Sequence, residues 1–450
     1  MLIPTTPSSS SSCPFQTSMA SSSSTKNLRL RWNDPFFFTS SILLSFILFW
    51  TIYCFLIPNP NPNPNTFPIS TTTIKNNSAS ALTTIGPSFY DNPTISYTTT
   101  AKITNWDAHR KAWLLSNPTL SKPLFMLTGS QSSPCQNPVG DHLLLKFYKN
   151  KADYCRLHNI DLFYNTILLH PLMFTYWAKI PLIRAAMIAH PEAEWFWWVD
   201  SDAAITDMDF SLPLHKYQNH NLIVHGWPHL VYENRSWVSL NAGVFLIRNC
   251  QWSLDFMDIW ASMGPQTPNY ESWGKTLKAE FSDKLFNDSD DQSALVYLLL
   301  HEKHKWVDKI YLENEFYFQG YWLEIIGKLN KIEDKYLEIE KRSPELRKRK
   351  AEKVASDANA AVREMYLREM KMRFGKEGWR RPFITHFTGC QPCSGDHNKM
   401  YSGKNCWEGM LRALNFADDQ VLRNYGFKYE KVDGNESATV RPLPFGFPAA

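Results

Sequence analysis

Apolar residues follow two patterns along the chain, and each predicts a different kind of segment. Residues 36–57 form an uninterrupted run of 22 uncharged, mainly apolar residues. As a helix this run spans roughly 33 Å, which matches the hydrocarbon core of a bilayer. From about Trp106 onward, short apolar runs alternate with stretches of helical periodicity. The first pattern predicts a single transmembrane helix and the second a globular α/β domain.

The alternation in the globular part predicts individual elements. Strands are expected at 122–130, 160–165 and 194–199, and helices at 142–158 and 174–190, the latter with a kink at Pro181. Strands that alternate with helices favour a mostly parallel, doubly wound sheet, in which ligands bind beyond the carboxyl ends of the strands. A charge-laced segment, Lys331 to Lys376, predicts one or two solvated surface helices.

The first hundred residues predict a membrane topology. Residues 1–35 are rich in Ser, Thr and Pro, which is typical of a disordered tail, and 58–105 have the composition of a flexible stalk. Pro-Asn repeats follow the apolar run instead of a small-residue cleavage site, so we expect an anchor at 36–57 and not a signal peptide. Three basic residues precede the anchor, and the next cation is Lys75, so the tail should be cytosolic and the domain 106–450 luminal.

A luminal location changes how cysteines and sequons are interpreted. Four Asn-x-Ser/Thr sequons would be accessible there: Asn76, Asn234, Asn287 and Asn435. Six of the eight cysteines follow the anchor, and an oxidising lumen favours disulfides, although the sequence leaves the pairing open. The alternative is a zinc site built from Cys390, Cys393 and Cys406 with His386 and His397.

The composition limits the classes of partner that this protein is expected to bind. The 47 Lys and Arg residues nearly balance 43 Asp and Glu, and a net charge of +4 gives no support to nucleic-acid binding. The 17 Trp residues indicate a large core, a carbohydrate-facing surface, or both. Trp227 and Trp237 are candidates to stack on sugar rings, with core packing as the alternative.

The clearest chemical signal is Asp200-Ser201-Asp202, which ends the apolar strand WFWWV. Two carboxylates at this spacing suit a hard divalent cation that keeps open positions for phosphate oxygens. The alternative is a strand-end turn with capping acids.

Several blocks resemble glycosyltransferase family 34 of plants: WWVDSDAAITDMDF, LNAGVFLIRNCQWSLDF, SDDQSALVYLL and RRPFITHFTGCQPCSG. The resemblance covers about Trp106 to Phe445. It implies a GT-A (Rossmann-like) fold, a single-pass type II protein of the Golgi membrane, and retaining transfer of a sugar from a UDP-sugar to a polysaccharide. The family includes xyloglucan 6-xylosyltransferases and galactomannan galactosyltransferases.

The resemblance also implies roles for individual residues. Mn²⁺ would be held by Asp200, Asp202 and His386. The nucleotide would lie along Leu127, Thr128, Gly129 and Ser201, with Lys179 and Arg184 as candidate contacts to phosphate or uridine unless they are solvated helix charges. The reaction centre would contain Asn241, Asp291 and Gln292, with Asp290 as a helix cap or supporting residue.

Departures from the xylosyltransferase pattern indicate the other branch. This chain has LNAGVFL and HFTGCQPCSG where xylosyltransferases read LNTGSFL and HFVGCKPCG, so Gln391 replaces a Lys. We expect α-1,6-galactosyl transfer from UDP-galactose to a β-1,4-mannan backbone, with a complex of polysaccharide synthases compatible with this role. The alternatives are xylosyl transfer from UDP-xylose to xyloglucan and a non-catalytic Golgi subunit. The route to retention stays open between covalent attack by Asp291 and same-face displacement.

Overall fold

The computed structural model describes residues 102–342, 361–369, 372, 380–430 and 439–443, all of which lie in one compact unit. Within these ranges, no helix is both long enough and apolar enough to span a bilayer. The predicted tail and anchor, nearly all of the predicted stalk, and the sequons at Asn76 and Asn435 lie outside the described residues.

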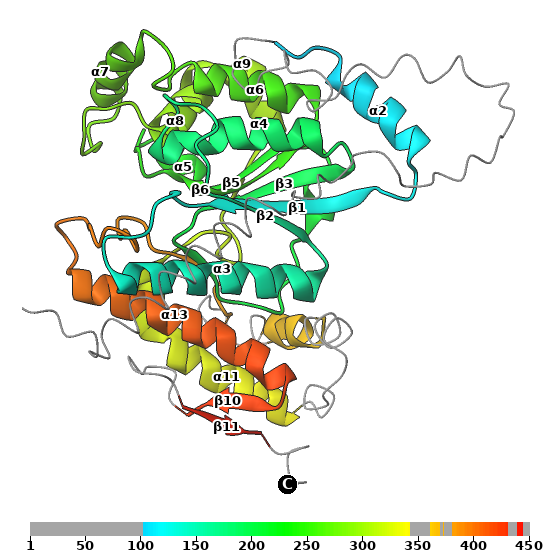
Figure 1. The fold of residues 1–450 in the computed structure, drawn as a ribbon, viewed down its shortest axis with the longest axis vertical. Coiled ribbons are helices and arrows are strands. Elements are labelled where there is room, and N and C mark those ends of the chain that lie inside the picture. Colours follow the sequence, from blue (N-terminus) through cyan, green and yellow to red (C-terminus); the bar gives the residue numbers. More distant parts are fainter. Residues whose placement is uncertain (1–101, 343–360, 370–371, 373–379, 431–438, 444–450) are drawn as a thin grey trace, which may run out of the picture. The chain divides into compact units, whose positions relative to one another are not determined.

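The centre of the fold is a six-stranded sheet (Figure 1). Its strands in spatial order are β2 (Asp161–Asn165), β1 (Lys122–Gly129), β3 (Ala193–Val199), β6 (Leu240–Arg248), β5 (Leu222–Gly226) and β7 (Ile310–Glu313). The predicted strands at 122–130, 160–165 and 194–199 correspond to β1, β2 and β3. Strand β3 is apolar from Trp195 to Val199 because this part is buried on both faces: Trp195 and Trp197 pack on one side, and Phe196 and Trp198 on the other.

The sheet is mostly parallel, as the sequence predicts, but it is not wholly so: five of its six strands run in one direction, and β6 is reversed. β1 runs parallel to β2 and β3, and β5 runs parallel to β7, but β6 runs antiparallel to both β3 and β5. The reversed direction has a consequence at the site. It places the beginning of β6 beside the end of β3, where the Asp200 N–H donates to the Gly243 carbonyl at 2.9 Å.

One layer of helices covers one face of the sheet (Figure 1). It contains α4 (Lys179–Ala189), α5 (Pro228–Tyr232), α6 (Gln251–Ala261), α7 (Tyr270–Glu280), α8 (Asp291–His301) and α9 (Lys303–Trp306). Pro181 does not kink a helix as predicted. It lies in the first turn of α4, where a missing N–H costs nothing, and the 3₁₀ helix η2 (Thr175–Ala178) precedes it.

A second layer lies on the opposite face, with α3 (Pro138–His158) against the sheet and α13 (Gly403–Asn424) and α11 (Leu329–Arg342) beyond it (Figure 1). Helix α3 begins where Asn137 accepts the N–H of Gly140 at 2.9 Å. The charge-laced segment begins with α11, and residues 361–369 are also helical. α11 is not wholly solvated, because Leu329, Ile332 and Tyr336 are buried.

A small sheet connects this second layer to the end of β3. Its order is β4 (Ala203–Ile205), β9 (Ile384–His386) and β8 (Gly320–Tyr321), and Ala203 pairs with His386. The remaining elements are α2 (Trp106–Ser116), α10 (Trp322–Ile325), η3 (Leu214–Tyr217), η4 (Val307–Lys309), η5 (Ile326–Lys328) and the hairpin of β10 (Phe427–Tyr429) and β11 (Val440–Pro442).

Among the described residues, four cysteines form two disulfides, Cys135–Cys393 and Cys390–Cys406, while Cys155 and Cys250 are free. The disulfides answer the question of pairing and exclude the zinc alternative, because the three thiols that would have bound zinc are all oxidised. Both bridges hold the loop that follows His386.

Candidate active site

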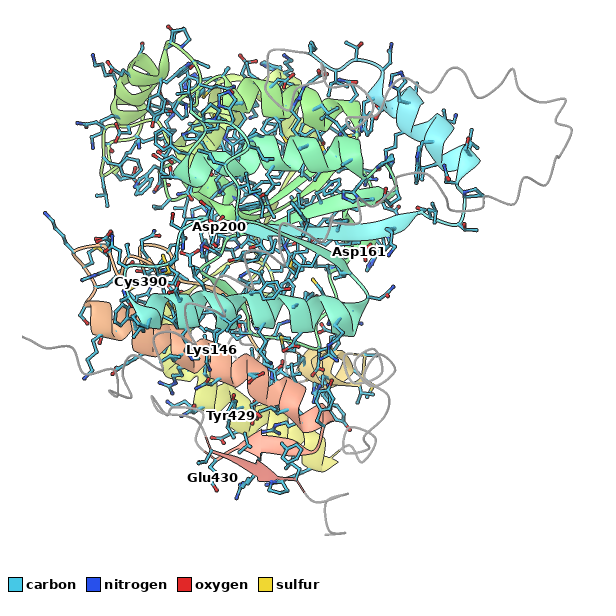
Figure 2. All side chains as sticks on the ribbon, viewed as in Figure 1. Lys146, Asp161, Asp200, Cys390, Tyr429 and Glu430 are labelled. Carbon is cyan, nitrogen blue, oxygen red and sulfur yellow. A yellow bond between two sulfur atoms is a disulfide. The ribbon has the colours of Figure 1, made fainter. Side chains whose placement is uncertain are left out.

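Two carboxylates and an imidazole converge where β3 ends. Asp200 and Asp202 come from the turn between β3 and β4, and His386 ends β9; one ligand atom from each lies within 4.8 Å of the others. The His386 Nε2 is 3.2 Å from Asp202 Oδ1 and 3.8 Å from Asp200 Oδ2. Figure 2 shows Asp200 between the central sheet and the α3 layer. Oxygen and imidazole donors together suit Mn²⁺ or a similar divalent ion.

The absence of a side chain at Gly243 makes room for this cluster. A Cβ at this position would lie 2.3 Å from His386 Cε1 and 2.4 Å from Asp200 Oδ2. Both distances are far inside van der Waals contact, so any larger residue would push the two ligands apart. The donor set and this cradle fit a bound divalent cation.

Lys179 links the carboxylate cluster to a second acid. Its Nζ is 2.7 Å from Asp291 Oδ2, 3.5 Å from Asp200 Oδ1 and 2.9 Å from the Ala242 carbonyl that it donates to. The side chain is 3% exposed. Burial by itself would lower the pKa of Lys179, but the attraction of Asp200 and Asp291 outweighs burial and raises that pKa. The lysine therefore stays charged and holds the two acids together.

Asp291 is the first residue of α8, and the residue before it explains how it is presented. Asp290 is the N-cap: it accepts the N–H of Ser293 at 2.8 Å and binds Lys284 Nζ at 2.6 Å. Asp290 therefore acts as a cap, one of the two roles considered for it. Burial raises the pKa of Asp291 to about 6, even though Lys179 lowers it. Asp291 is thus mainly ionised at neutral pH and protonated in mild acid.

Asn241 and Gln292 lie side by side next to Asp291. The Asn241 amide nitrogen is 3.5 Å from Gln292 Oε1, and Gln292 also accepts the Ala242 N–H at 3.3 Å. Gln292 donates to the carbonyl of Trp237 at 3.0 Å. The structure therefore brings all three predicted reaction-centre residues together. Among the aromatic candidates, Trp237 is half-buried and Trp227 is 36% exposed.

The predicted nucleotide loop lies at the end of β1. Gly129 is required there, because a Cβ would lie 2.3 Å from the Asn165 carbonyl oxygen of β2. The Thr128 hydroxyl is buried and makes no hydrogen bond in the described part of the chain. The Leu127 side chain is fully buried in the core.

Arg184 does not belong to the site. It is 1% exposed and its Nε is 3.7 Å from Asp258 Oδ1, so it forms an ion pair within the helix layer between α4 and α6. Arg184 is therefore neither a phosphate contact nor a solvated helix charge, the two alternatives considered from the sequence.

Two buried residues behind the metal-binding cluster were not identified from the sequence. The amide nitrogen of Gln319 is 3.4 Å from His386 Nδ1. Lys151 of α3 donates to the carbonyl oxygens of Ala203 at 2.8 Å and Ser201 at 3.3 Å. Burial lowers the pKa of Lys151 to about 7, against the attraction of Asp202 and Asp200. The sequence did contain a signal for Lys151: it is a charged residue on the apolar face of an amphipathic helix, four residues after Phe147.

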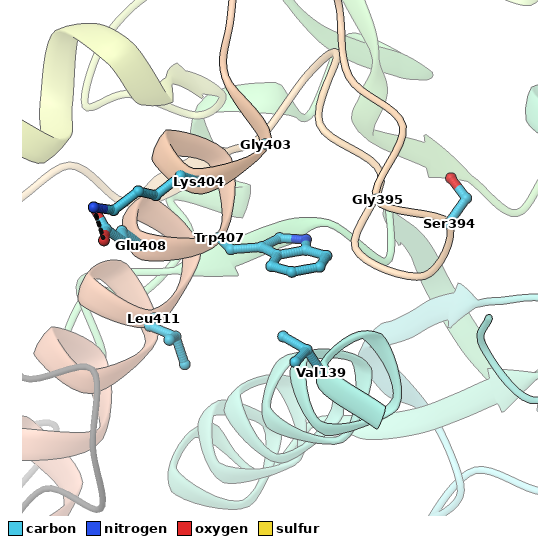
Figure 3. A pocket seen from close by; sticks show the side chains of 8 residues that line it. All are labelled: Val139, Ser394, Gly395, Gly403, Lys404, Trp407, Glu408 and Leu411. Atoms are coloured by element: carbon cyan, nitrogen blue, oxygen red, sulfur yellow. Dashed lines mark ion pairs between the residues drawn. The ribbon is translucent and has the colours of Figure 1, made fainter. Parts of the chain in front are cut away.

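A cavity of about 610 Å³ lies away from these residues, between the beginnings of α3 and α13 (Figure 3). Trp407 forms one wall, Val139 and Leu411 line it, and Lys404 pairs with Glu408 at its edge at 3.7 Å. None of the predicted site residues lines this cavity.

Sequence comparison identifies the class of protein to which this candidate site belongs. The chain belongs to the galactosyl transferase GMA12/MNN10 family, whose profile matches residues 121–397. It is a hexosyltransferase.

Among its relatives is galactomannan galactosyltransferase 1 of Cyamopsis tetragonoloba, which is 58% identical over 80% of this chain and 82% of that protein. A protein described as a probable xyloglucan 6-xylosyltransferase 3 of Arabidopsis thaliana is 43% identical over 78% of this chain and 71% of that protein. A solved glycosyltransferase involved in glycosylation of the PBCV-1 major capsid is 16% identical, covers 43% of this chain and 82% of its own, and has a TM-score of 0.31, too weak a likeness to bear on the fold.

Proposed function

We propose that this protein is a metal-dependent, retaining galactosyltransferase. It would transfer galactose from UDP-galactose, in α-1,6 linkage, to mannosyl residues of a β-1,4-mannan backbone. The observation that carries the proposal is the cluster of Asp200, Asp202 and His386, joined through Lys179 to Asp291. The 58% identity to a galactomannan galactosyltransferase supports the choice of sugar and acceptor.

Each part of the cluster would have a distinct task. Asp200, Asp202 and His386 would hold a divalent cation, which when bound stabilises the negative charge of the departing diphosphate. Lys179 pairs with both Asp200 and Asp291 and would add a positive charge near that phosphate. Asn241 and Gln292 offer both donors and acceptors to sugar hydroxyl groups. Thr128 and Gly129 would border the nucleotide, with Ser201 on the turn between the two acids.

For the retaining step we propose same-face displacement, in which the leaving phosphate accepts the proton of the attacking hydroxyl. Asp291 is a poor candidate for covalent attack because one carboxylate oxygen is already paired with Lys179 at 2.7 Å and the residue is only 4% exposed. Its ionised carboxylate instead supplies negative charge to a transition state that has oxocarbenium character.

We also propose that the enzyme is a single-pass type II protein of the Golgi membrane, anchored by residues 36–57. The uncharged apolar run and the basic residues before it support this topology. Two disulfides in the described domain are compatible with an oxidising lumen.

A grid of donors and acceptors tests the proposed reaction. The purified full-length chain is assayed with Mn²⁺, with UDP-galactose, UDP-xylose or UDP-glucose as donor, and with mannan or glucan oligosaccharides as acceptor. We expect galactose transfer to the mannan oligosaccharides, and a loss of about 10²-fold or more in the Asp202→Asn variant.

Each other outcome of the grid contradicts one part of the proposal. Transfer of xylose to glucan without transfer of galactose would assign the chain to the xylosyltransferase alternative. Folded protein that transfers no sugar with any donor would favour the non-catalytic subunit. Full activity of Asp202→Asn in a metal chelator would overturn the metal dependence.

A further inference from the structure

The turn that carries Asp200 and Asp202 is supported from behind by a helix. Strand β4 follows the turn directly, and one of its edges pairs with β9, which places Ala203 opposite His386. In the described part of the chain its other edge is bonded by side chains of α3 instead of by a strand. All three candidate metal ligands are therefore positioned by contacts to one short strand.

The first of these side chains is Asn150, which replaces a strand partner for Ile205. Its amide nitrogen donates to the Ile205 carbonyl at 2.9 Å, and its amide oxygen accepts the Ile205 N–H at 2.8 Å. This two-bond contact fixes the far end of β4 relative to α3.

The second is Lys151, which bonds the near end of β4 and the turn itself. Its Nζ donates to the carbonyl of Ala203 at 2.8 Å and to that of Ser201 at 3.3 Å. These two carbonyls belong to the residues on either side of Asp202. Fixing both of them fixes the backbone from which the Asp202 side chain projects.

The burial of Lys151 indicates that this contact serves a purpose beyond packing. The residue is 0% exposed, and in the described part of the chain it has no carboxylate within 4.0 Å. A lysine without an acidic partner is costly to bury, whether it stays charged or gives up its proton. An apolar side chain of similar length would fill the same space on the apolar face of α3 without that cost. What such a side chain would lose are the two bonds to the metal-binding turn.

We propose that Lys151 is a positioning residue for the metal site, which holds the turn around Asp202 in the conformation that binds the cation. The proposal rests on the metal-dependent function proposed above. Groups that orient metal ligands from behind commonly change metal affinity by 10- to 100-fold.

The test compares two lysines of the same helix. Lys151→Met removes the donors and the charge but keeps the length of the side chain. Lys146→Met is the matched control: Lys146 also lies on α3 (Figure 2), but its Nζ bonds Asn415 of α13 at 3.0 Å and not the turn. Mn²⁺ binding to the purified full-length proteins is measured by the electron paramagnetic resonance of free Mn²⁺, at a temperature where thermal unfolding shows each protein to be folded.

We expect the Mn²⁺ dissociation constant of Lys151→Met to rise about 10- to 100-fold, and that of Lys146→Met to stay within about 2-fold of wild type. In activity assays, saturating Mn²⁺ should restore most of the kcat of Lys151→Met, while its KM for the acceptor stays unchanged. A purely structural role would lower thermal stability without changing Mn²⁺ affinity.

Wild-type Mn²⁺ affinity in folded Lys151→Met overturns the proposal. If that variant does not fold, Lys151→Leu, which also removes both donated bonds, is compared with Lys146→Leu in the same way, and wild-type Mn²⁺ affinity in folded Lys151→Leu overturns the proposal. Failure of the wild-type protein itself to bind Mn²⁺ is a different result, because it refutes the proposed metal dependence and not the role of Lys151 alone.

Discussion

At the scale of single residues, the site depends on small size as much as on charge. Asp200 and His386 approach each other across the backbone of Gly243, and the Trp198 indole donates to Asp200 at 2.6 Å from the other side. The carboxylate is therefore confined by a glycine, a tryptophan and Lys179. Little room is left for it to adjust to a substitution.

Gly243→Ala should consequently weaken metal binding. The added methyl group would overlap His386 Cε1 and Asp200 Oδ2, so one of the two ligands must move. We expect Mn²⁺ affinity, measured by isothermal titration calorimetry, to fall about 10- to 100-fold.

The chain offers a matched control at Gly327, where a Cβ would meet nothing within 4 Å. Gly327→Ala should leave Mn²⁺ affinity unchanged. Equal affinities in the two variants would show that the close approach at Gly243 does not define the site.

His225 has a pKa that burial lowers to about 4, with its Nδ1 lacking a hydrogen-bond partner in the described residues. An unfolded histidine has a pKa near 6.5, so the unfolded state binds the proton more readily. The contribution of His225 to stability is complete above pH 6.5 and is lost as the pH falls toward 4.

Between pH 7.5 and 5, this histidine should therefore reduce the free energy of unfolding by roughly 2 kcal/mol. Denaturant titrations of the wild type and of His225→Gln at both pH values measure the effect. The variant should lose that part of the pH dependence, and identical slopes would contradict the assignment of the low pKa to His225.

At the scale of elements, the direction of one strand determines which residues meet. Because β6 is antiparallel to β3, its first residues lie beside the carboxyl end of β3, and Asn241 and Gly243 join the cluster. A parallel β6 would have placed them at the opposite edge of the sheet. The loop after β9 is held by a comparable constraint, since its two disulfides attach it to α13 and to the segment before α3.

Removal of the bridge between Cys390 and Cys406 should destabilise this region. The bridge closes a short loop, with a sequence separation of 16, and such a cross-link contributes about 3 kcal/mol. We expect the Cys390→Ala/Cys406→Ala double variant to lose about that much in a chemical unfolding experiment.

Cys250→Ser is the control, because Cys250 is free and half-buried. It should change stability by less than about 1 kcal/mol. A loss in the double variant no larger than in the control would mean that the bridge does not constrain the loop.

At the scale of the whole molecule, the surface bears on the proposed topology. Asn234 and Asn287, the two sequons within the described residues, are both exposed. An oligosaccharide transferase could reach both if the domain enters the secretory lumen.

We therefore expect the protein expressed in plant cells to carry N-glycans at these positions. Digestion with a peptide N-glycosidase that accepts plant glycans should increase its gel mobility, and Asn234→Gln and Asn287→Gln should each reduce that shift. A chain with no glycans that co-fractionates with the cytosol would contradict the luminal orientation.

Much of the fold and part of the site could be predicted from local patterns. Runs of apolar residues, and the polar residues that end them, predict three strands, two helices and one pair of acids: β1, β2, β3, α3, α4, and Asp200 with Asp202. These features are local, because a buried strand and the turn after it are encoded within about ten neighbouring residues. His386 was identified by resemblance to a family, since its own surroundings in the sequence do not distinguish it from a core histidine.

Only the tertiary structure decided the direction of β6, the two disulfides, the place of Arg184 and the contacts that Lys151 and Gln319 make behind the candidate site. The contact between His386 and Asp202 spans 184 positions, and that between Lys151 and Ala203 spans 52. Periodicity reports which side of an element is buried, but not which distant group it will meet there. The sequence by itself determined where acids end a buried strand, and the packing of β4 between β9 and α3 turned those acids into a candidate metal site.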